Sequence, residues 1–224
     1  LEAPKEITYS ETGERMEVST PAGTTTSITL DDGTQVLLSA NSRLEYSKSF
    51  SADKREVKLV GEARFNVAKD AERPFIVHTR QLQTQVLGTV FDVKAYPQTP
   101  ADVTLYEGKV EVSLNGDAPQ LMQPGEQAFL DKEGKLQLTK APEETGKWAE
   151  GEFAFDDKEL KSVMQEIGSW YNISVVFHSR PLLEERIYLR MNRKVDANEV
   201  LTILNDMGIA KFEIVKEKIV VSKI

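Results

Sequence analysis

The chain contains no cysteine and only two histidines, which leaves several kinds of site without ligands. Without thiols there is neither a disulfide framework nor a thiolate metal site. His78 and His178 are far apart in the sequence, and no HExxH motif is present, so a zinc site has no local pair of ligands. We therefore expect no metal and no cofactor.

Basic residues are outnumbered by acidic ones, with 28 Lys and Arg against 36 Asp and Glu and a net charge of −8. This balance argues against nucleic acid and against an anionic membrane surface as partners, because binding phosphates needs clustered cations. No apolar run approaches the ~20 residues of a membrane span. The sequence begins with Leu1 and not Met, so we expect a portion excised from a longer protein.

Motifs of catalysis are also missing. The sequence has no GxSxG nucleophile elbow, no GxGxxG and no GK[ST] loop. His78 lies in a predicted strand without a nucleophile motif beside it. Asp31-Asp32-Gly33 and Asp131-Lys132-Glu133-Gly134 do not extend into a calcium-binding loop, so they are interpreted as turns. We predict that the protein is not an enzyme.

The 224 residues, 40% of them hydrophobic, suit one large or two small globular domains. From about residue 15 to 139 the sequence reads as short strands separated by Gly, Pro, Asn or Asp, which predicts an all-β domain: a sandwich, a barrel or a solenoid-like stack. Residues 140–146 are polar, contain Pro and Gly, and are typical of a linker. We therefore expect an all-β domain over residues 1–146 and a second domain over 147–224.

Residues 152–224 contain a hidden duplication. Asp156 is a predicted helix N-cap, and the apolar residues after it follow helical spacing: Leu160, Val163, Met164 and Ile167. The same pattern recurs forty residues later behind Asp196. Strands flank both helices, so the predicted order is β-α-β-β-α-β-β. This predicts a small α/β domain with its helices on one face of a sheet, and with the apolar stripe in the core.

The stretch Leu87-Gly88-Thr89-Val90-Phe91-Asp92-Val93 interrupts an apolar run with a glycine and an aspartate. Strand alternation places Leu87, Phe91 and Val93 on one face and Asp92 on the other, solvated face. Gly88 is interpreted as a bulge or as a close approach of a neighbouring backbone.

A predicted strand in the second domain is the candidate binding site for a partner. Its odd positions are apolar and its even positions would face out. If it lies at a sheet edge, its free backbone groups could pair with a strand of another chain. The alternative is an ordinary strand with one wet face. The candidate partner-binding residues are Ile187, Tyr188, Leu189, Arg190 and Met191.

Seven short motifs occur in a fixed order: Thr20–Gly23 with Leu30–Thr34, Leu37–Ser42, Gly61–Val67, Pro74–Val77, Val86–Val93, Glu107–Val110 and Pro124–Ala128. Together they resemble the periplasmic domain of FecR-type anti-sigma factors. The tail, with Trp148-Ala149-Glu150-Gly151 and Phe153-Ala154-Phe155, resembles the C-terminal domain of FecR-like proteins in Bacteroidetes. That domain is similar to the secretin/TonB short N-terminal domain.

This resemblance implies a function that the composition alone does not. The parent protein would be anchored in the inner membrane, with this portion in the periplasm. The N-terminal signalling domain of an outer-membrane TonB-dependent transporter would contact it. Proteolysis of the anti-sigma factor would follow, with release or activation of an extracytoplasmic-function sigma factor bound through a cytoplasmic segment. The alternative is a carbohydrate-binding module or an enzyme built on the β domain.

Overall fold

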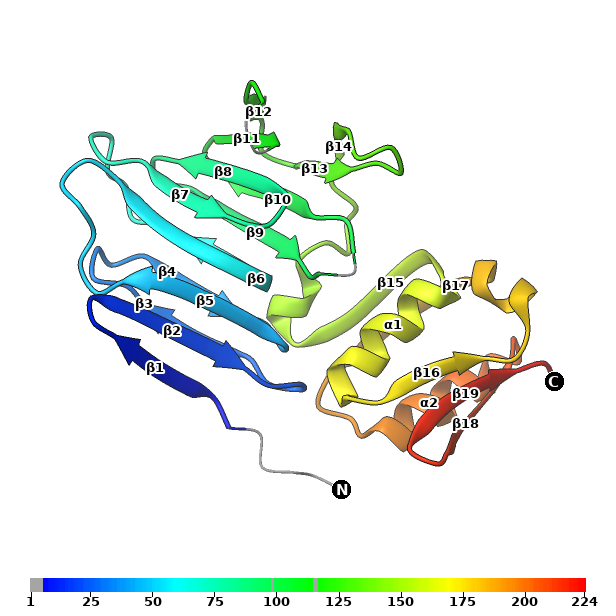
Figure 1. Ribbon diagram of the computed structural model, residues 1–224. Coiled ribbons are helices and arrows are strands. Elements are labelled where there is room, and N and C mark those ends of the chain that lie inside the picture. Colours follow the sequence, from blue (N-terminus) through cyan, green and yellow to red (C-terminus); the bar gives the residue numbers. More distant parts are fainter. Residues whose placement is uncertain (1–5, 98, 115–116) are drawn as a thin grey trace. The chain divides into compact units, whose positions relative to one another are not determined.

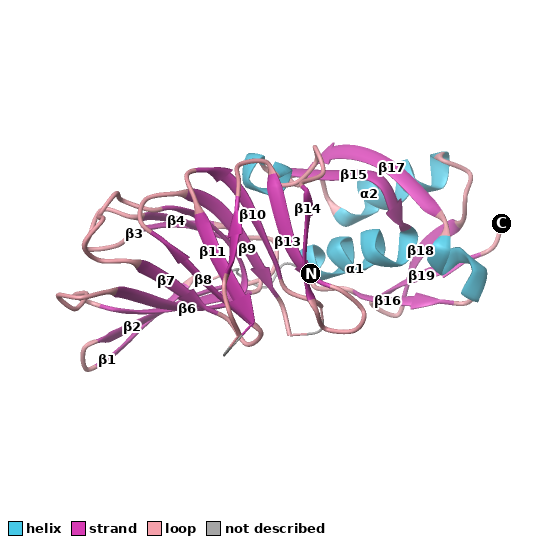
Figure 2. Ribbon diagram, turned by 90° about the horizontal axis from the view of Figure 1, so that it is seen from above, coloured by secondary structure: helices cyan, strands magenta, loops and turns pink. Residues whose placement is uncertain are grey.

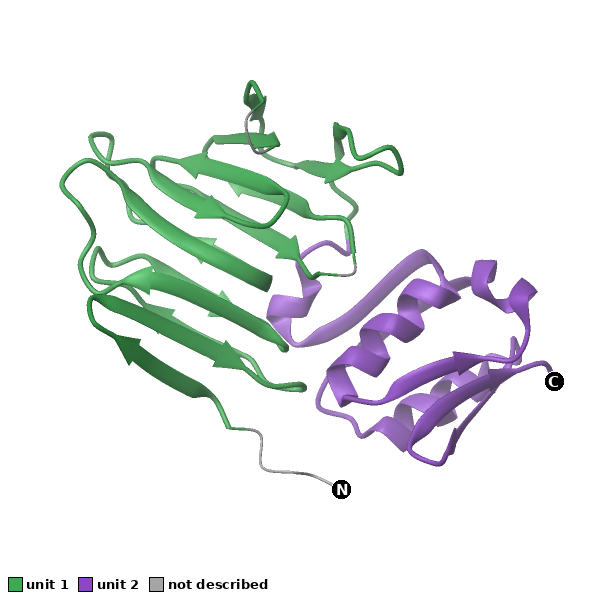
Figure 3. Cartoon of the chain, viewed as in Figure 1, with its two compact units in different colours: residues 1–143 green, residues 144–224 purple. Residues whose placement is uncertain are grey.

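The structure, a computed structural model, describes residues 6–97, 99–114 and 117–224. The chain forms two compact units, residues 1–143 and residues 144–224 (Figure 3). The expected linker, residues 140–146, spans this boundary. Each unit is described by itself below.

Unit 1 consists of β-strands in its described residues, so the prediction of an all-β domain is confirmed (Figure 1). The strands are β1 (Thr8–Thr12), β2 (Arg15–Thr20), β3 (Thr26–Thr29), β4 (Gln35–Leu38), β5 (Ser42–Ser47), β6 (Arg55–Asn66), β7 (Phe75–His78), β8 (Leu82–Val86), β9 (Val90–Ala95), β10 (Asp102–Glu107), β11 (Val110–Leu114), β12 (Gln120–Met122), β13 (Glu126–Leu130) and β14 (Leu136–Lys140).

The long strand β6 belongs to two sheets. Its first half pairs with β5 and β7, and its second half pairs with β4 and β9. The halves meet at Gly61, where φ is 102° and a Cβ atom would lie 2.2 Å from the Ser42 Oγ atom. Only glycine fits so close to a neighbouring strand in this conformation. The first sheet has the order β1-β2-β5-β6-β7-β8-β11-β12, and the second has the order β3-β4-β6-β9-β10-β13-β14.

The two sheets lie face to face as two layers (Figure 2), and their inward side chains form a single core. At its centre the Phe65 ring stacks on Phe91 at 5.2 Å and meets Phe75 at 5.9 Å. The Asp31-Asp32-Gly33 turn joins the antiparallel strands β3 and β4, as predicted. The β domain is thus a sandwich in which β6 switches layers.

Asp92 is buried, with 5% of its surface exposed, so the prediction of a solvated aspartate is wrong. It accepts hydrogen bonds from Arg64 Nε at 2.7 Å, from Arg64 Nη2 at 2.9 Å and from the Tyr106 hydroxyl at 2.8 Å. Arg64 is its cross-strand partner on β6, a pairing that the local sequence does not reveal. The prediction that Leu87 shares a face with Phe91 and Val93 is also wrong, because Leu87 is exposed and β9 begins only at Val90.

Gly88 allows the close approach that was predicted for it. A Cβ atom at this position would lie 2.8 Å from the Lys69 Cα atom. The two segments are joined by hydrogen bonds from Asp70 N–H to the Leu87 carbonyl at 2.8 Å and from Val67 N–H to the Thr89 carbonyl at 3.0 Å. The glycine therefore holds the segment after β6 against the β8–β9 connection.

Unit 2 has the predicted element order β-α-β-β-α-β-β, with two short 3-10 helices added. The apolar stripe of the first helix is fully buried, as predicted. The elements are η1 (Lys147–Glu150), β15 (Glu152–Glu159), α1 (Leu160–Tyr171), β16 (Ser174–Phe177), η2 (Arg180–Glu184), β17 (Arg186–Asn192), α2 (Ala197–Asp206), β18 (Lys211–Val215) and β19 (Lys218–Ser222).

The strands of unit 2 form two sheets, so the expectation of helices on one face of a single sheet is wrong. The strands that precede the helices, β15 and β17, pair with each other. The strands that follow the helices form the second sheet, in the order β16-β19-β18. Both helices lie between the two sheets, and one core cluster includes side chains of both sheets and both helices (Figure 2). The sequence duplication predicts the strands of each repeat. It does not specify whether a strand pairs with a strand of its own repeat or with one of the other repeat.

The two predicted helix caps differ in outcome. Asp196 caps α2, accepting hydrogen bonds from the backbone N–H groups of Asn198 at 2.8 Å and Glu199 at 3.0 Å. Asp156 is not a cap, because β15 continues to Glu159 and α1 begins only at Leu160. Asp156 instead lies in an irregularity of the β15–β17 pairing, between Phe155 and Lys158.

Candidate partner-binding edge

The candidate strand is β17, and it forms the edge of a two-stranded sheet. Within the described part of the chain its only strand partner is β15. The side chain of Ile187 is buried, and Leu189 and Met191 pack against the same core. Tyr188 and Arg190 are exposed. The alternation predicted for residues 187–191 is therefore present.

The hydrogen bonds at the two ends of β17 show which backbone groups are free. Arg193 N–H donates to the Gly151 carbonyl at 2.8 Å, and Leu160 N–H donates to the Glu185 carbonyl at 2.7 Å. Because residues in an antiparallel pair turn alternately toward and away from the partner strand, Ile187, Leu189 and Met191 face β15. The outward-facing backbone groups are those of Arg186, Tyr188, Arg190 and Asn192.

Tyr188 lies opposite a bulge in β15. Asp156 and Asp157 together oppose this one residue, and Asp157 has a φ of 49°. A hydrogen bond to the Asp157 carboxylate raises the pKa of Tyr188. The Tyr188 side chain is 61% exposed. Bulges commonly redirect a side chain, and exposed Tyr and Arg are favoured anchors of interfaces, so the bulge sets a tyrosine beside a free edge.

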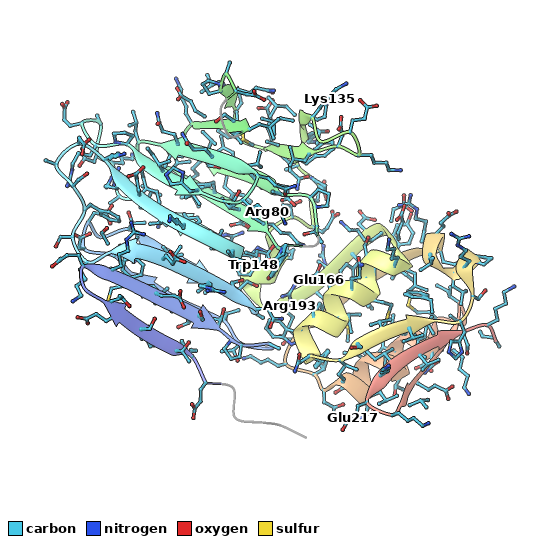
Figure 4. All side chains as sticks on the ribbon, in the orientation of Figure 1. Arg80, Lys135, Trp148, Glu166, Arg193 and Glu217 are labelled. Carbon is cyan, nitrogen blue, oxygen red and sulfur yellow. The ribbon has the colours of Figure 1, made fainter. Side chains whose placement is uncertain are left out.

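Arg193 fixes the end of β17, a role that sequence reasoning missed. It is only 6% exposed, and its guanidinium lies 4.7 Å from the centre of the Phe153 ring and 4.9 Å from that of Trp170. It pairs with Glu166 on α1 (Figure 4) and donates to the Glu152 carbonyl at 3.0 Å. An arginine directly after a strand gives no signal of these contacts, which come from two different elements, β15 and α1.

The other outer strands of unit 2 are either partly blocked by a side chain or shorter than β17. On β18, the side-chain amide of Asn205 donates to the Phe212 carbonyl at 2.9 Å and accepts from its N–H at 2.8 Å. On β15, the Glu152 carbonyl is occupied by Arg193. The outer strand β16 has four residues against seven in β17. Edge strands are commonly protected by such side chains. Among the described residues, no side chain protects the outer edge of β17 in this way.

The described residues contain no group of three or more His, Cys, Asp or Glu side chains that could hold a metal ion. His78 lies on β7, where its Nε2 atom is 3.1 Å from Glu56. None of the helices in the described part of the chain is long and apolar enough to cross a membrane.

Comparisons with known proteins agree on one family. The model of the FecR protein family matches residues 16–111, and the model of the FecR C-terminal region matches residues 152–221. Two crystal structures of a protein from Parabacteroides distasonis ATCC 8503, assigned as an anti-sigma factor, were solved at 2.50 and 1.65 Å resolution, and each superimposes with a TM-score of 0.84 at 30% identity. The matches cover 94% and 93% of this chain and 99% of each P. distasonis chain. No curated protein matches.

The chain belongs to the FecR family. It is a signalling region of an anti-sigma factor, and both family and fold favour a regulator over an enzyme. The FecR C-terminal match includes β17, so the candidate edge lies inside the FecR-type region. The similarity of unit 2 to the secretin/TonB short N-terminal domain stays a prediction.

Proposed function

We propose that this chain is the periplasmic sensor region of a membrane-anchored anti-sigma factor, and that unit 2 binds the N-terminal signalling domain of an outer-membrane TonB-dependent transporter. The observation that carries the proposal is the unprotected edge of β17 in a FecR-type chain. In this account residues 187–191 form the contact, and the signal passes to an extracytoplasmic-function sigma factor.

Binding would occur by addition of a strand. A strand of the transporter domain would pair with the outward backbone groups of Tyr188 and Arg190, extending the two-stranded sheet to three strands. The exposed side chains of these two residues would supply specificity beside the ladder. A two-stranded sheet is marginal by itself, so a third strand also stabilises the element that receives it.

The test is calorimetric titration of the full 224-residue chain with the signalling domain of the transporter encoded beside it. The double variant Tyr188→Ala, Arg190→Ala is expected to weaken binding by about 100-fold, since truncation of an interface anchor costs about 2 kcal/mol or more. The control is Lys211→Ala, Glu213→Ala, which removes an exposed ion pair on β18 and should bind as the wild type does. Absence of binding at high micromolar concentration, or equal losses in both variants, would count against the proposal.

A further inference from the structure

A groove on the outer face of unit 1 has no role in the function proposed above. Its cavity volume is about 520 Å³, and it lies between the segment after β6 and strands β8, β11 and β12. This volume falls within the roughly 300–1,000 Å³ that is typical of small-molecule sites. The segment is held in place by the close approach of Lys69 to Gly88 and by the hydrogen bond from Asp70 N–H to the Leu87 carbonyl at 2.8 Å.

The floor of the groove is apolar and exposed. Leu87 and Leu121 are each 49% exposed, and both line the cavity. Ala71 and Gly108 add further apolar surface. Two exposed leucines in one cavity form an apolar surface whose contact with water is unfavourable. Binding of an apolar ligand body would release this water.

The acidic side chains that line the groove have hydrogen-bond partners, whereas its two lysines have no carboxylate partner among the described residues. Asp70 is bound by Arg73 Nε at 2.8 Å and by two backbone N–H groups, and Glu111 accepts from Gln85 Nε2 at 3.3 Å. By contrast, among the described residues neither Lys69 nor Lys109 is paired with a carboxylate. The groove therefore offers two uncommitted ammonium groups beside an apolar floor, in a chain whose net charge is −8.

We propose that this groove binds a small organic anion with an apolar body, such as a medium-chain carboxylate. The carboxylate would lie between Lys69 and Lys109, and the apolar body would cover Leu87 and Leu121. A peptide strand fits less well, because β8 is paired on both edges, with β7 and β11, and β11 is paired with β8 and β12. Among the described strands that line the groove, only the three-residue β12 has an unpaired edge, so the groove offers mainly side chains and little free backbone ladder.

The test uses 8-anilinonaphthalene-1-sulfonate, an apolar anion whose fluorescence rises on binding, with the full 224-residue chain. One site is expected, with competition by decanoate and weaker binding of the neutral analogue N-phenyl-1-naphthylamine. The variant Lys69→Gln, Lys109→Gln should lower the affinity about 10-fold, the equivalent of about 1.4 kcal/mol. The matched variant Lys132→Gln, Lys135→Gln has the same change of charge outside the groove and should bind within about 2-fold of the wild type.

Both variants should melt at the temperature of the wild type, because all four lysines are exposed. Four outcomes would overturn the proposal. They are absence of binding by either anion at millimolar concentration, equal binding of the neutral analogue, equal loss in the two lysine variants, and binding of an acidic hexapeptide without binding of decanoate.

Discussion

At the scale of single residues, Asp92 is the clearest example of a side chain that accepts hydrogen bonds from residues on other strands. It holds Arg64 by two hydrogen bonds and Tyr106 by a third, and the guanidinium of Arg64 lies 4.6 Å from the centre of the Tyr106 ring. Burial, with the nearby Asp92 charge as the next cause, raises the pKa of Tyr106. The three side chains form one unit on neighbouring strands of the second sheet.

We predict that Asp92→Ala lowers the free energy of unfolding by about 2–4 kcal/mol, because it removes the carboxylate that accepts two hydrogen bonds from the Arg64 guanidinium and one from the Tyr106 hydroxyl. Urea unfolding followed by circular dichroism measures the change. Glu133→Ala is the control: it removes an ion pair with Lys135 whose side chains are 71% and 69% exposed, and it should cost less than about 0.5 kcal/mol. Equal costs for the two variants would contradict the account.

Tyr96 links stability to high pH. Burial, with the Glu62 charge as the next cause, raises the pKa of Tyr96 to about 12, and its hydroxyl donates to the Ala40 carbonyl at 2.8 Å. An unfolded tyrosine has a pKa of about 10, so the folded state retains the proton longer. The contribution of Tyr96 is therefore complete below pH ~10 and is lost as the pH rises to about 12.

We predict that unfolding free energy declines between pH 10 and 12, and that Tyr96→Phe makes the decline shallower by about 1–3 kcal/mol over that range. Urea titrations at pH 8, 10 and 11 measure the slope. A slope that Tyr96→Phe does not alter would show that this hydroxyl does not titrate on unfolding in that range.

At the scale of elements, the two helices of unit 2 differ in how their N-termini are capped, although their apolar positions follow the same pattern. Asp196→Ala should lower the free energy of unfolding by about 1 kcal/mol, because two backbone N–H groups lose their acceptor. Asp156→Ala is the matched change in the other repeat, and it should cost no more than about 0.5 kcal/mol because Asp156 is exposed and caps nothing. Thermal unfolding of both variants distinguishes them, and a larger loss at Asp156 would be inconsistent with the structure.

Substitution by proline tests the two edges of β17 separately, because proline has no backbone N–H. Arg190→Pro removes an N–H that faces away from β15, so the variant should stay folded and lose affinity for the transporter domain. Leu189→Pro removes an N–H that faces β15 and should destabilise unit 2 by about 3 kcal/mol or more. Circular dichroism reports folding and calorimetry reports binding. If the Arg190 variant kept full affinity, the outer edge would not be the contact.

Sequence patterns predicted the elements of unit 2 better than their pairing. Helical spacing identified the buried stripe of α1, and strand alternation identified the two faces of β17, because both follow from local geometry. The two-sheet arrangement, the bulge opposite Tyr188 and the contacts of Arg193 depend on residues distant in the sequence. The burial of Asp92 was missed for the same reason, since its partner Arg64 lies on another strand.

At the scale of the whole molecule, the chain has two separate hydrophobic cores. Unit 1 is a sandwich around one apolar cluster, and unit 2 has a separate cluster between its two sheets. The ordered motifs of the sequence were sufficient to predict both the β domain and the family. They could not show which strand edge is free, because that depends on which edges are reached by side chains of other elements, such as Asn205 of α2 at β18.

The central claim, that β17 receives a partner strand, is tested most directly by hydrogen exchange at single amides in the complex. The full chain is compared alone and with the signalling domain of the transporter encoded beside it. The account predicts new protection at the N–H groups of Tyr188 and Arg190, and little change at Leu189 and Met191, which already face β15. Protection confined to β16 or β18, or no alternation along β17, would contradict it.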